Sequence, residues 1–229
     1  MKTIGLIGGT TWVSTQDYYR YFNQKVSEKL GGYHSARCII YSVDFQDVIN
    51  YKHEGRDEAM KKLMLDAANK VAYAGAECLL LGANTMHRLA GFIQERINIP
   101  LIHIGEETAR AINATGLQKV GLLGTKITME EEFYLEKLAS HKIEAIVPDE
   151  ADRDFIDQSI FKEFSKEIYT ESTRKEYAKI IGTLVDRGAQ GIIMGCTEIP
   201  LLLRQEDYNI PLFNTTEIHA EAAVNFALE

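Results

Sequence analysis

The sequence predicts an α/β protein made of two similar doubly wound lobes, related by a pseudo-twofold axis, with a ligand site in the cleft between them. Two observations lead to this prediction. Short apolar runs alternate with longer amphipathic stretches along the chain, which is typical of parallel strands joined by crossover helices. Three blocks of the first half also recur in the second half in the same order, which indicates a duplicated unit.

In the first half, three apolar runs are expected to form strands: TIGLIG, RCIIYSV and ECLLLGA, which begin at Thr3, Arg37 and Glu77. Helices are expected over about residues 14–30 and 56–74, and again in LAGFIQERI. Ligands of such sheets collect at the carboxyl ends of the strands. The residues directly after each apolar run are therefore the candidates for a site.

The second half repeats this pattern. KVGLLGT matches TIGLIGG with Gly121 in the place of Gly5, an offset of 116, while RGAQGIIMGCTE matches AGAECLLLGANT at 113 and IPLFNTTEIHAEAA matches IPLIHIGEETARAI at 111. Such similar offsets predict the tandem duplication of a unit of roughly 110 residues. We expect residues 1–115 and 210–229 to form the first lobe, and residues 116–209 to form the second.

Composition excludes several classes of protein. The chain has 229 residues, of which 45% are hydrophobic, so it is long enough to bury a large core. It carries 33 acidic and 25 basic residues for a net charge of −8, which disfavours nucleic acid or an anionic membrane as a partner. No apolar run approaches the roughly 20 residues that span a bilayer, and the N-terminus is unlike a signal peptide. We therefore expect a cytoplasmic protein.

The three cysteines, Cys38, Cys78 and Cys196, are odd in number and have no C-x-x-C spacing. This argues against a disulfide framework and against a structural zinc site. Cys38 and Cys78 lie at apolar runs and are expected to pack as small apolar residues. Cys196 follows an apolar run and precedes Thr197 and Glu198, where backbone N–H groups can stabilise a thiolate. It is the candidate reactive thiol, and a buried packing role is the alternative.

The glycine-rich stretch LIGGTTW follows the first expected strand. Its backbone amides could approach a carboxylate or phosphate, but it lacks the patterns of a phosphate loop and of a dinucleotide site. The alternative is a tight turn before a helix capped by Ser14 or Thr15.

Six motifs, in order across almost the whole chain, resemble the aspartate/glutamate racemase family: GGTTWVSTQDYY, SVDF, NTMH, LLGTKITME, GCTEIPLL and TTEIHAEAA. The resemblance implies two Rossmann-like lobes with the active site between them, a small-molecule amino-acid substrate, no cofactor and a homodimer. It also implies a mechanism in which one acid/base group from each lobe moves the Cα proton from one face of the substrate to the other. Inversion needs two groups, because the proton leaves one face and arrives on the opposite one.

Position by position, the resemblance places Cys196 on the second catalytic cysteine, with Thr197 and Glu198 in its substrate-contact turn. Asn84 and Thr85 fall on the turn that holds the α-carboxylate or ammonium group. Further substrate contacts fall on Thr10, Thr11, Trp12 and Lys166.

Lys166 resembles a family lysine that meets a substrate carboxylate. The residue after it is Glu167, where glycine is usual in the family. An ordinary exposed helix lysine is the alternative.

Position 83 departs from the family, which has cysteine there, or threonine in the branch that this sequence most resembles. Ala83 has no proton to give or take. The residue is either a designed change in a racemase or a natural feature of a one-base enzyme, such as a malonate-type decarboxylase in which Cys196 delivers the proton. A non-catalytic amino-acid or dicarboxylate-binding protein is a third alternative, and a slow racemase with a relay through Thr85, Thr11 or water is a fourth. The favoured interpretation is a racemase of a small acidic amino acid, with Cys196 on one face and Ala83 at the missing partner's position.

Among the histidines, His87 and His219 lie after the two site motifs, and the resemblance implies an orienting or hydrogen-bonding role for them. Packing or capping is the alternative for His87. The other histidines are expected to be non-catalytic: His34, His53, His103 and His141. No set of histidine, aspartate and cysteine residues has metal-ligand spacing.

Overall fold

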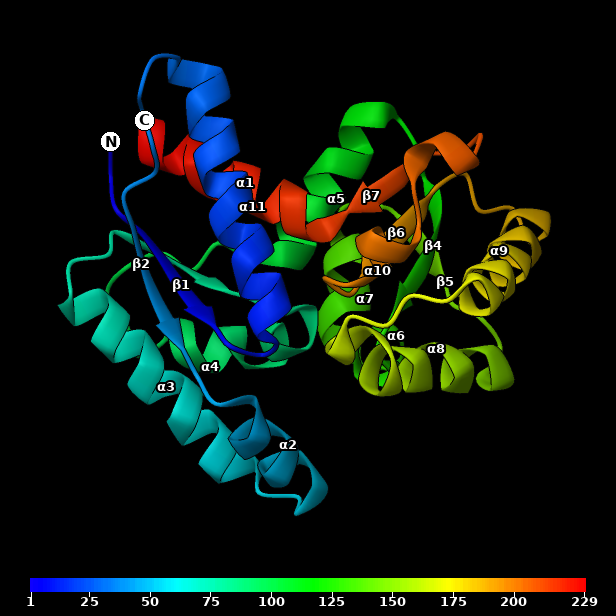
Figure 1. The fold of residues 1–229 in the computed structure, drawn as a ribbon, viewed down its shortest axis with the longest axis horizontal. Helices are drawn as coiled ribbons and strands as arrows, with labels where there is room; N and C mark the ends of the chain where they lie inside the picture. The colour runs from blue at the N-terminus through cyan, green and yellow to red at the C-terminus, as the bar shows by residue number, and fades with distance from the viewer. The chain divides into compact units, whose positions relative to one another are not determined.

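The structure, a computed structural model, describes all of residues 1–229 and divides into two compact units. The first unit comprises Met1–His103 and His219–Glu229, and the second comprises Ile104–Ile218. Each unit has its own sheet of parallel strands flanked by helices (Figure 1). The predicted α/β fold is confirmed.

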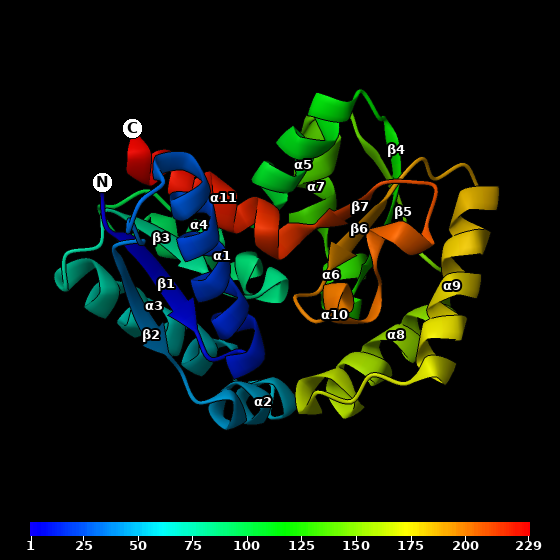
Figure 2. The ribbon, with the colours of Figure 1, turned by 45° about the horizontal axis from the view of Figure 1, so that its top comes forward.

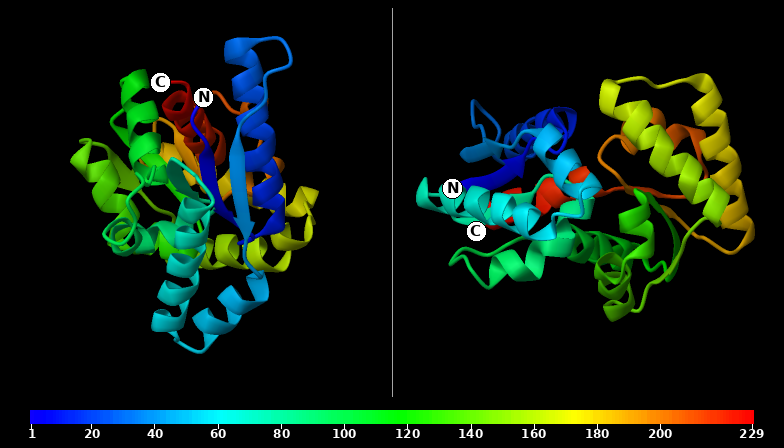
Figure 3. Two further views of the ribbon diagram at one scale, coloured as in Figure 1. Left: turned by 90° about the vertical axis from the view of Figure 1, so that its left-hand side faces the viewer. Right: turned by 90° about the horizontal axis from the view of Figure 1, so that it is seen from below.

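The sheet of the first unit has β1 (Ile4–Gly8) between β2 (Cys38–Ser42) and β3 (Cys78–Leu81). Helices α1 (Trp12–Leu30) and α3 (Asp57–Tyr73) lie on opposite sides of β1 and β2 (Figure 3). Both faces of the sheet are therefore covered, and β1 and β3 are apolar at every position that carries a side chain.

The remaining elements of the first unit are short, apart from the last helix. They are α2 (Phe45–His53), η1 (Asn84–Leu89), α4 (Ala90–Gln94) and the part of α11 (Thr215–Leu228) that follows Ile218. The sequence pattern did not predict α2, whose first turn is capped by Asp44 through a 2.9 Å hydrogen bond from the Gln46 amide.

The sheet of the second unit has β4 (Lys119–Gly124) between β5 (Glu144–Ile146) and β6 (Ile192–Gly195), with β7 (Leu212–Asn214) beside β6. Within this unit, α5 and α7 lie together on one side of the sheet, and α8 and α9 lie on the other (Figure 2). Its helices are α5 (Ile104–Thr115), α6 (Lys126–Glu130), α7 (Glu132–Ser140), α8 (Glu150–Lys162), η2 (Phe164–Lys166), α9 (Glu171–Asp186), α10 (Ile199–Leu202) and η3 (Gln205–Asp207).

The three strands of the first sheet have the same order as β5, β4 and β6 of the second, and the pairs β1–β3 and β4–β6 share their register. In the first, Gly5 of β1 pairs with Leu79 of β3, and in the second, Gly121 of β4 pairs with Ile192 of β6. These four residues correspond at the offsets of 116 and 113 seen in the sequence. The recurrent blocks therefore fold into equivalent strands.

In each sheet, a glutamine side chain binds the backbone of the segment that lies beside β3 or β6. The backbone N–H of Leu101, which bridges to β3, donates to Gln94 Oε1 at 2.7 Å, and that of Leu212, which begins β7, donates to Gln205 Oε1 at 2.8 Å. Each glutamine also donates through Nε2 to the carbonyl two residues before that leucine: Gln94 to Ile99 at 3.1 Å, and Gln205 to Ile210 at 3.0 Å. The repeat extends to side-chain detail.

The unit boundaries differ from those expected at residues 115 and 210. Helix α5 belongs to the second unit, because Ile104, Ala109 and Ile112 are buried in that unit's core. Residues 210–218 also stay in the second unit, since β7 pairs with β6. Only the segment from His219 onward returns to the first unit, where Ala220, Ala223, Val224 and Ala227 pack with residues of β1, β3 and α1.

The first helix also begins earlier than its polar residues suggested. It starts at Trp12 with Thr11 as its N-cap, and Thr11 Oγ1 accepts a 3.3 Å hydrogen bond from the Ser14 amide. Thr15 instead uses its hydroxyl to accept from the Gly9 amide at 2.8 Å. Both residues expected as caps thus lie inside the helix.

None of the helices has the length and apolar character needed to cross a membrane.

Candidate active site

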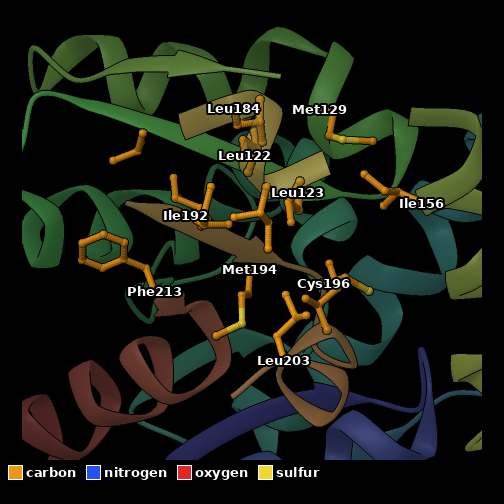
Figure 4. Close-up of a cluster of buried hydrophobic side chains, with 14 of the residues drawn as sticks. Leu122, Leu123, Met129, Ile156, Leu184, Ile192, Met194, Cys196, Leu203 and Phe213 are labelled. Carbon is orange, nitrogen blue, oxygen red and sulfur yellow. The ribbon is translucent and has the colours of Figure 1, made fainter. Parts of the chain in front are cut away.

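Cys196 lies at the carboxyl end of β6, where two strands approach closely. A side chain on Gly195 would place its Cβ 2.7 Å from the Leu123 carbonyl oxygen, and one on Gly124 would lie 2.8 Å from the Gly195 carbonyl oxygen. Only glycine fits at both positions. Cys196 is the first residue after this contact and borders the apolar core that contains Met194 and Leu203 (Figure 4).

The Cys196 thiol donates to a buried carboxylate. Its Sγ lies 3.0 Å from Glu198 Oε2, and the Thr197 hydroxyl donates to the same oxygen at 2.7 Å. All three residues are buried, and Glu198 is only 3% exposed. Burial, followed by the charge and hydrogen bond of Glu198, raises the pKa of Cys196 well above its ordinary value, while backbone N–H groups of Glu198 and Thr197 act in the opposite direction.

This arrangement favours a thiol over a thiolate while Glu198 is ionised. Two unit negative charges about 3 Å apart repel by roughly 5 kcal/mol even at an effective dielectric constant of about 20. The cysteine can therefore donate a proton as it stands. To accept one, it needs the carboxylate to be neutralised or moved.

Ala83 occupies the matching place in the first unit, after β3. Its backbone is extended, with φ −153° and ψ 139°, and its carbonyl oxygen accepts from the His87 ring at 3.0 Å and from the Met86 amide at 3.3 Å. Asn84 is buried and Thr85 half-buried in the η1 turn that follows. This turn follows the carboxyl end of β3 as the Cys196 turn follows that of β6, but it carries a methyl group where the second unit carries a thiol.

The glycine-rich loop after β1 is tied to the Ala83 turn by a serine. Ser14 Oγ lies 3.0 Å from the Thr11 carbonyl oxygen and 3.3 Å from that of Gly82, so one hydroxyl proton is shared between the two turns. The sequence had suggested Ser14 only as a helix cap. Since β1 and β3 are neighbours, the loop and the Ala83 turn lie at the same edge of the sheet.

The three loop residues expected to contact a substrate differ in what they offer. Thr11 caps α1, Trp12 is 52% exposed, and Thr10 has a buried hydroxyl oxygen without a hydrogen-bond partner. Gly9 has φ +88°, and a Cβ there would lie 2.2 Å from the Val43 carbonyl oxygen. The loop is therefore held against the end of β2 by a glycine that no other residue can replace.

A cluster of histidines lies behind Ala83. His87 Nδ1 donates to the Ala83 carbonyl, which leaves Nε2 as an acceptor, and that buried atom has no hydrogen-bond partner. His219 Nε2 donates to the Ile102 carbonyl at 2.8 Å, so its Nδ1 accepts from the Tyr18 hydroxyl at 2.7 Å. The His87 ring contacts the rings of His103 and His219 edge-on, with centroids 4.8 and 5.3 Å apart.

Both buried histidines are neutral. Burial lowers the pKa of His219 to about 3, and burial together with His103 and His219 holds the pKa of His87 well below its ordinary value. The i, i+4 spacing from Ala83 to His87 could have suggested their contact. The partnership with His219 could not be read from the sequence, because 132 positions separate the two residues.

Lys166 ends the short helix η2 and is exposed. Glu167 follows with φ 58°, in the left-handed region that favours glycine. This backbone conformation explains why the related family usually has glycine at this position.

The other two cysteines behave as packing residues. Cys78 is fully buried in β3, and burial raises its pKa to about 11. Burial also raises the pKa of Cys38. No group of three or more histidine, cysteine, aspartate or glutamate side chains is placed to hold a metal ion.

Comparison with known proteins identifies the family that this chain resembles in sequence and fold. The family model of the Asp/Glu/hydantoin racemases matches residues 7–223. A Yersinia pestis protein of solved structure, provisionally named an Asp/Glu racemase, is 44% identical over the whole of both chains, with a TM-score of 0.93. The structure of an aspartate racemase homologue from Pyrococcus horikoshii is 34% identical over the whole of both chains, with a TM-score of 0.86. The broad specificity amino-acid racemase RacX of Bacillus subtilis is 26% identical over 73% of this chain and 72% of its own.

Proposed function

The chain belongs to the Asp/Glu/hydantoin racemase family, and from that membership we propose a cofactor-independent amino-acid racemase that moves the Cα proton of a small acidic amino acid, aspartate or glutamate. The observation that carries the proposal is the Cys196 thiol at the carboxyl end of β6, hydrogen-bonded to Glu198. The raised pKa of Cys196 keeps it a proton donor, and neutralisation of Glu198 would bring it toward the ordinary thiol pKa of about 8.5, where it could also accept a proton.

In this proposal Cys196 exchanges the proton on one face of Cα. Ala83 stands at the position that the family resemblance assigns to the acid/base group for the other face, and its methyl group can neither give nor take a proton. Exchange is then rapid on one face, while inversion depends on a slower donor such as Thr85, Thr11 or water.

The proposed substrate contacts follow the family resemblance. Asn84 and Thr85 would hold the α-carboxylate or ammonium group, and Thr197 would be a further contact. Thr10, whose buried hydroxyl has no hydrogen-bond partner, is well suited to contact a ligand. Lys166 would meet the side-chain carboxylate by charge pairing. The remaining proposed contacts are Thr11, Trp12 and Glu198, and the proposed assembly is a homodimer.

A one-base decarboxylase of a malonate-type acid is the second candidate. It is favoured by the pairing of Glu198 with a protonated Cys196, together with a methyl group at position 83. Loss of carbon dioxide leaves the bonding electrons on Cα, and the Cys196 thiol would deliver its proton to that carbon. Such a reaction needs a donor on one face only.

Proton NMR in deuterated water tests the proposal. The chain, its Cys196→Ser variant, and its Ala83→Thr and Ala83→Cys variants are each incubated with L- and D-aspartate and L- and D-glutamate. We expect the chain to exchange the Cα proton of one enantiomer, Cys196→Ser to lose that exchange, and one Ala83 variant to invert the substrate.

Absence of Cα exchange for all four amino acids with the chain and both Ala83 variants would refute the racemase proposal for these substrates. The same samples then receive phenylmalonate, and release of carbon dioxide would favour the decarboxylase. Binding of aspartate or glutamate without exchange or decarboxylation would indicate a binding protein.

A further inference from the structure

We propose that Cys196 and Glu198 hold one proton in common, and that Glu198 is a positioning residue that keeps this proton whenever Cys196 removes another from Cα. The inference deepens the proposed function and rests on it for the step at Cα. It changes the expected role of Glu198, which the family resemblance assigned to substrate contact.

The geometry places both donors on one carboxylate oxygen. Cys196 Sγ lies 3.0 Å from Glu198 Oε2, and Thr197 Oγ1 lies 2.7 Å from the same atom. Glu198 is 3% exposed and precedes α10, so bulk water has little access to its carboxylate. A carboxylate buried in this way is stabilised by its donors, and the thiol is one of them.

Charge decides how many protons the pair retains. With no proton on either residue, a thiolate and a carboxylate would lie in contact in a buried place, which is strongly unfavourable. Cys196 also acts electrostatically on Tyr177 of α9, which is buried and bonded to Ser159 Oγ at 2.9 Å. Burial raises the pKa of Tyr177 above its ordinary value, so it remains neutral and adds no further negative charge beside the pair.

The protons balance if the pair alternates between one and two. When the single proton lies on Glu198, Cys196 is a thiolate. The thiolate then takes the proton of Cα: an S–H bond forms, the C–H bond breaks, and its electron pair stays on the substrate. The pair then holds two protons and is neutral. In the reverse direction the thiol returns its proton to carbon while Glu198 keeps the other, so two adjacent anions never form.

The first unit has no equivalent carboxylate. Thr85 corresponds to Glu198 at the offset of 113, and Asn84 corresponds to Thr197. A thiol and a carboxylate that share a proton are therefore possible only in the turn that carries Cys196.

The test follows the ionisation of Cys196 directly. The full chain is labelled with [3-13C]cysteine, and the three Cβ signals are recorded as pH is raised, with Cys196→Ser used to assign the signal of Cys196. The variants are Glu198→Gln, which removes the charge at nearly constant shape, and Thr197→Val, which removes only the second donor. Glu136→Gln, exposed on α7, removes the same charge at a distance.

We expect the unaltered chain to keep Cys196 as a thiol to a pH above the ordinary range of cysteine. Glu198→Gln should lower the apparent pKa of Cys196 by about one unit or more, Thr197→Val should change it less, and Glu136→Gln should leave it unchanged. An ordinary titration of Cys196 in the unaltered chain, which needs no folded variant, would overturn the inference. An unchanged or raised pKa in folded Glu198→Gln would overturn it as well.

Cα exchange of the same samples separates this inference from the proposed function. We expect the pH at which exchange is half-maximal to move with the NMR titration of Cys196. If the titration shifts as expected but no variant exchanges any Cα proton, the shared proton stands and the racemase proposal fails.

Discussion

The turn after β6 and the turn after β3 occupy equivalent places in two sheets with the same strand order and register. The second-unit turn carries Cys196, bonded to a buried carboxylate. The first-unit turn carries Ala83, whose only polar contacts are made by its backbone, to His87 and Met86. A duplicated scaffold has therefore kept its geometry in both halves while its side chains have diverged.

The difference is that only the second-unit turn carries a thiol and a carboxylate, so under the proposed function proton chemistry is confined to that turn. In the second unit the polar atoms of the turn bond to one another, so their ionisation states depend on each other. In the first unit the neutral ring of His87 donates to the Ala83 carbonyl and contacts the neutral ring of His219. Four predictions break or sharpen this comparison.

Exchanging the two side chains should have the largest effect. In a double variant, Ala83→Cys with Cys196→Ala, the thiol lies in a turn where Thr85 replaces Glu198. Under the proposed function, Cα exchange of the original enantiomer should fall by about 10²–10⁴-fold, and exchange of the opposite enantiomer should appear, because the acid/base group now meets the other face. Proton NMR in deuterated water measures both rates.

The single variant Cys196→Ala is the control, and it should lose exchange without gaining any. If the double variant exchanged the same enantiomer as the unaltered chain, the assignment of one turn to each face would be wrong.

Acid should destabilise the first unit through its histidines. The pKa of His219 is lowered by folding, so the unfolded chain binds the proton more tightly. The stability that comes from keeping this histidine neutral is complete above its unfolded value of about 6.5 and is lost as pH falls from there toward 3. At pH 3, the lower end of this range, the free energy of unfolding should have fallen by roughly 4 kcal/mol.

Trp12, the one tryptophan, lies in the first unit, and its fluorescence can follow urea unfolding of that unit between pH 7 and 4. His219→Gln keeps a donor and an acceptor without a titrating ring, and it should flatten the pH dependence. His34→Gln, at an exposed position of the same unit, should leave the dependence as it was. If the free energy of unfolding fell equally steeply with pH in all three proteins, the role given to His219 would be contradicted.

The glycines before the two turns should differ in tolerance. A Cβ on Gly195 would lie 2.7 Å from a backbone oxygen, whereas one on Gly82 would lie 3.0 Å from its nearest atom, also a backbone oxygen. We expect Gly195→Ala to reduce the free energy of unfolding by about 2 kcal/mol and Gly82→Ala by about 1 kcal/mol. Urea unfolding of both variants measures the order, and a larger cost for Gly82→Ala would show that the second-unit turn relaxes more easily.

Glu167→Gly should have the smallest effect and the opposite sign. Glu167 has φ 58°, a conformation that costs an L-residue more than it costs glycine. After the added flexibility of the unfolded chain is subtracted, we expect a gain of about 0.5 kcal/mol. Thermal unfolding measures it, with Glu136→Gly inside α7 as the control, which should lose about 1 kcal/mol. A loss in both variants would mean that Glu167 makes contacts worth more than its strain.

Much of the fold could be predicted because it depends on short patterns. The alternation of apolar runs located β1, β3 and β4, and the recurrent blocks anticipated two sheets of equal register. The unit boundaries were misplaced because α5 is continuous with the first half in sequence but buries Ile104 and Ile112 in the second unit's core. The start of α1 was misplaced because several neighbouring hydroxyl residues could each have been the cap.

The sequence by itself determined the α/β class, the duplication and the presence of a lone thiol after a strand, since each follows from residue type and local spacing. Tertiary structure decided which groups act on one another. Glu198 bonds to Cys196 because the chain turns back within two residues, and His219 reaches Tyr18 and lies edge-on against His87 because α11 returns to the first unit. Desolvation and hydrogen bonding act through space, so the ionisation of these groups follows from the folded contacts and cannot be read from their order in the chain.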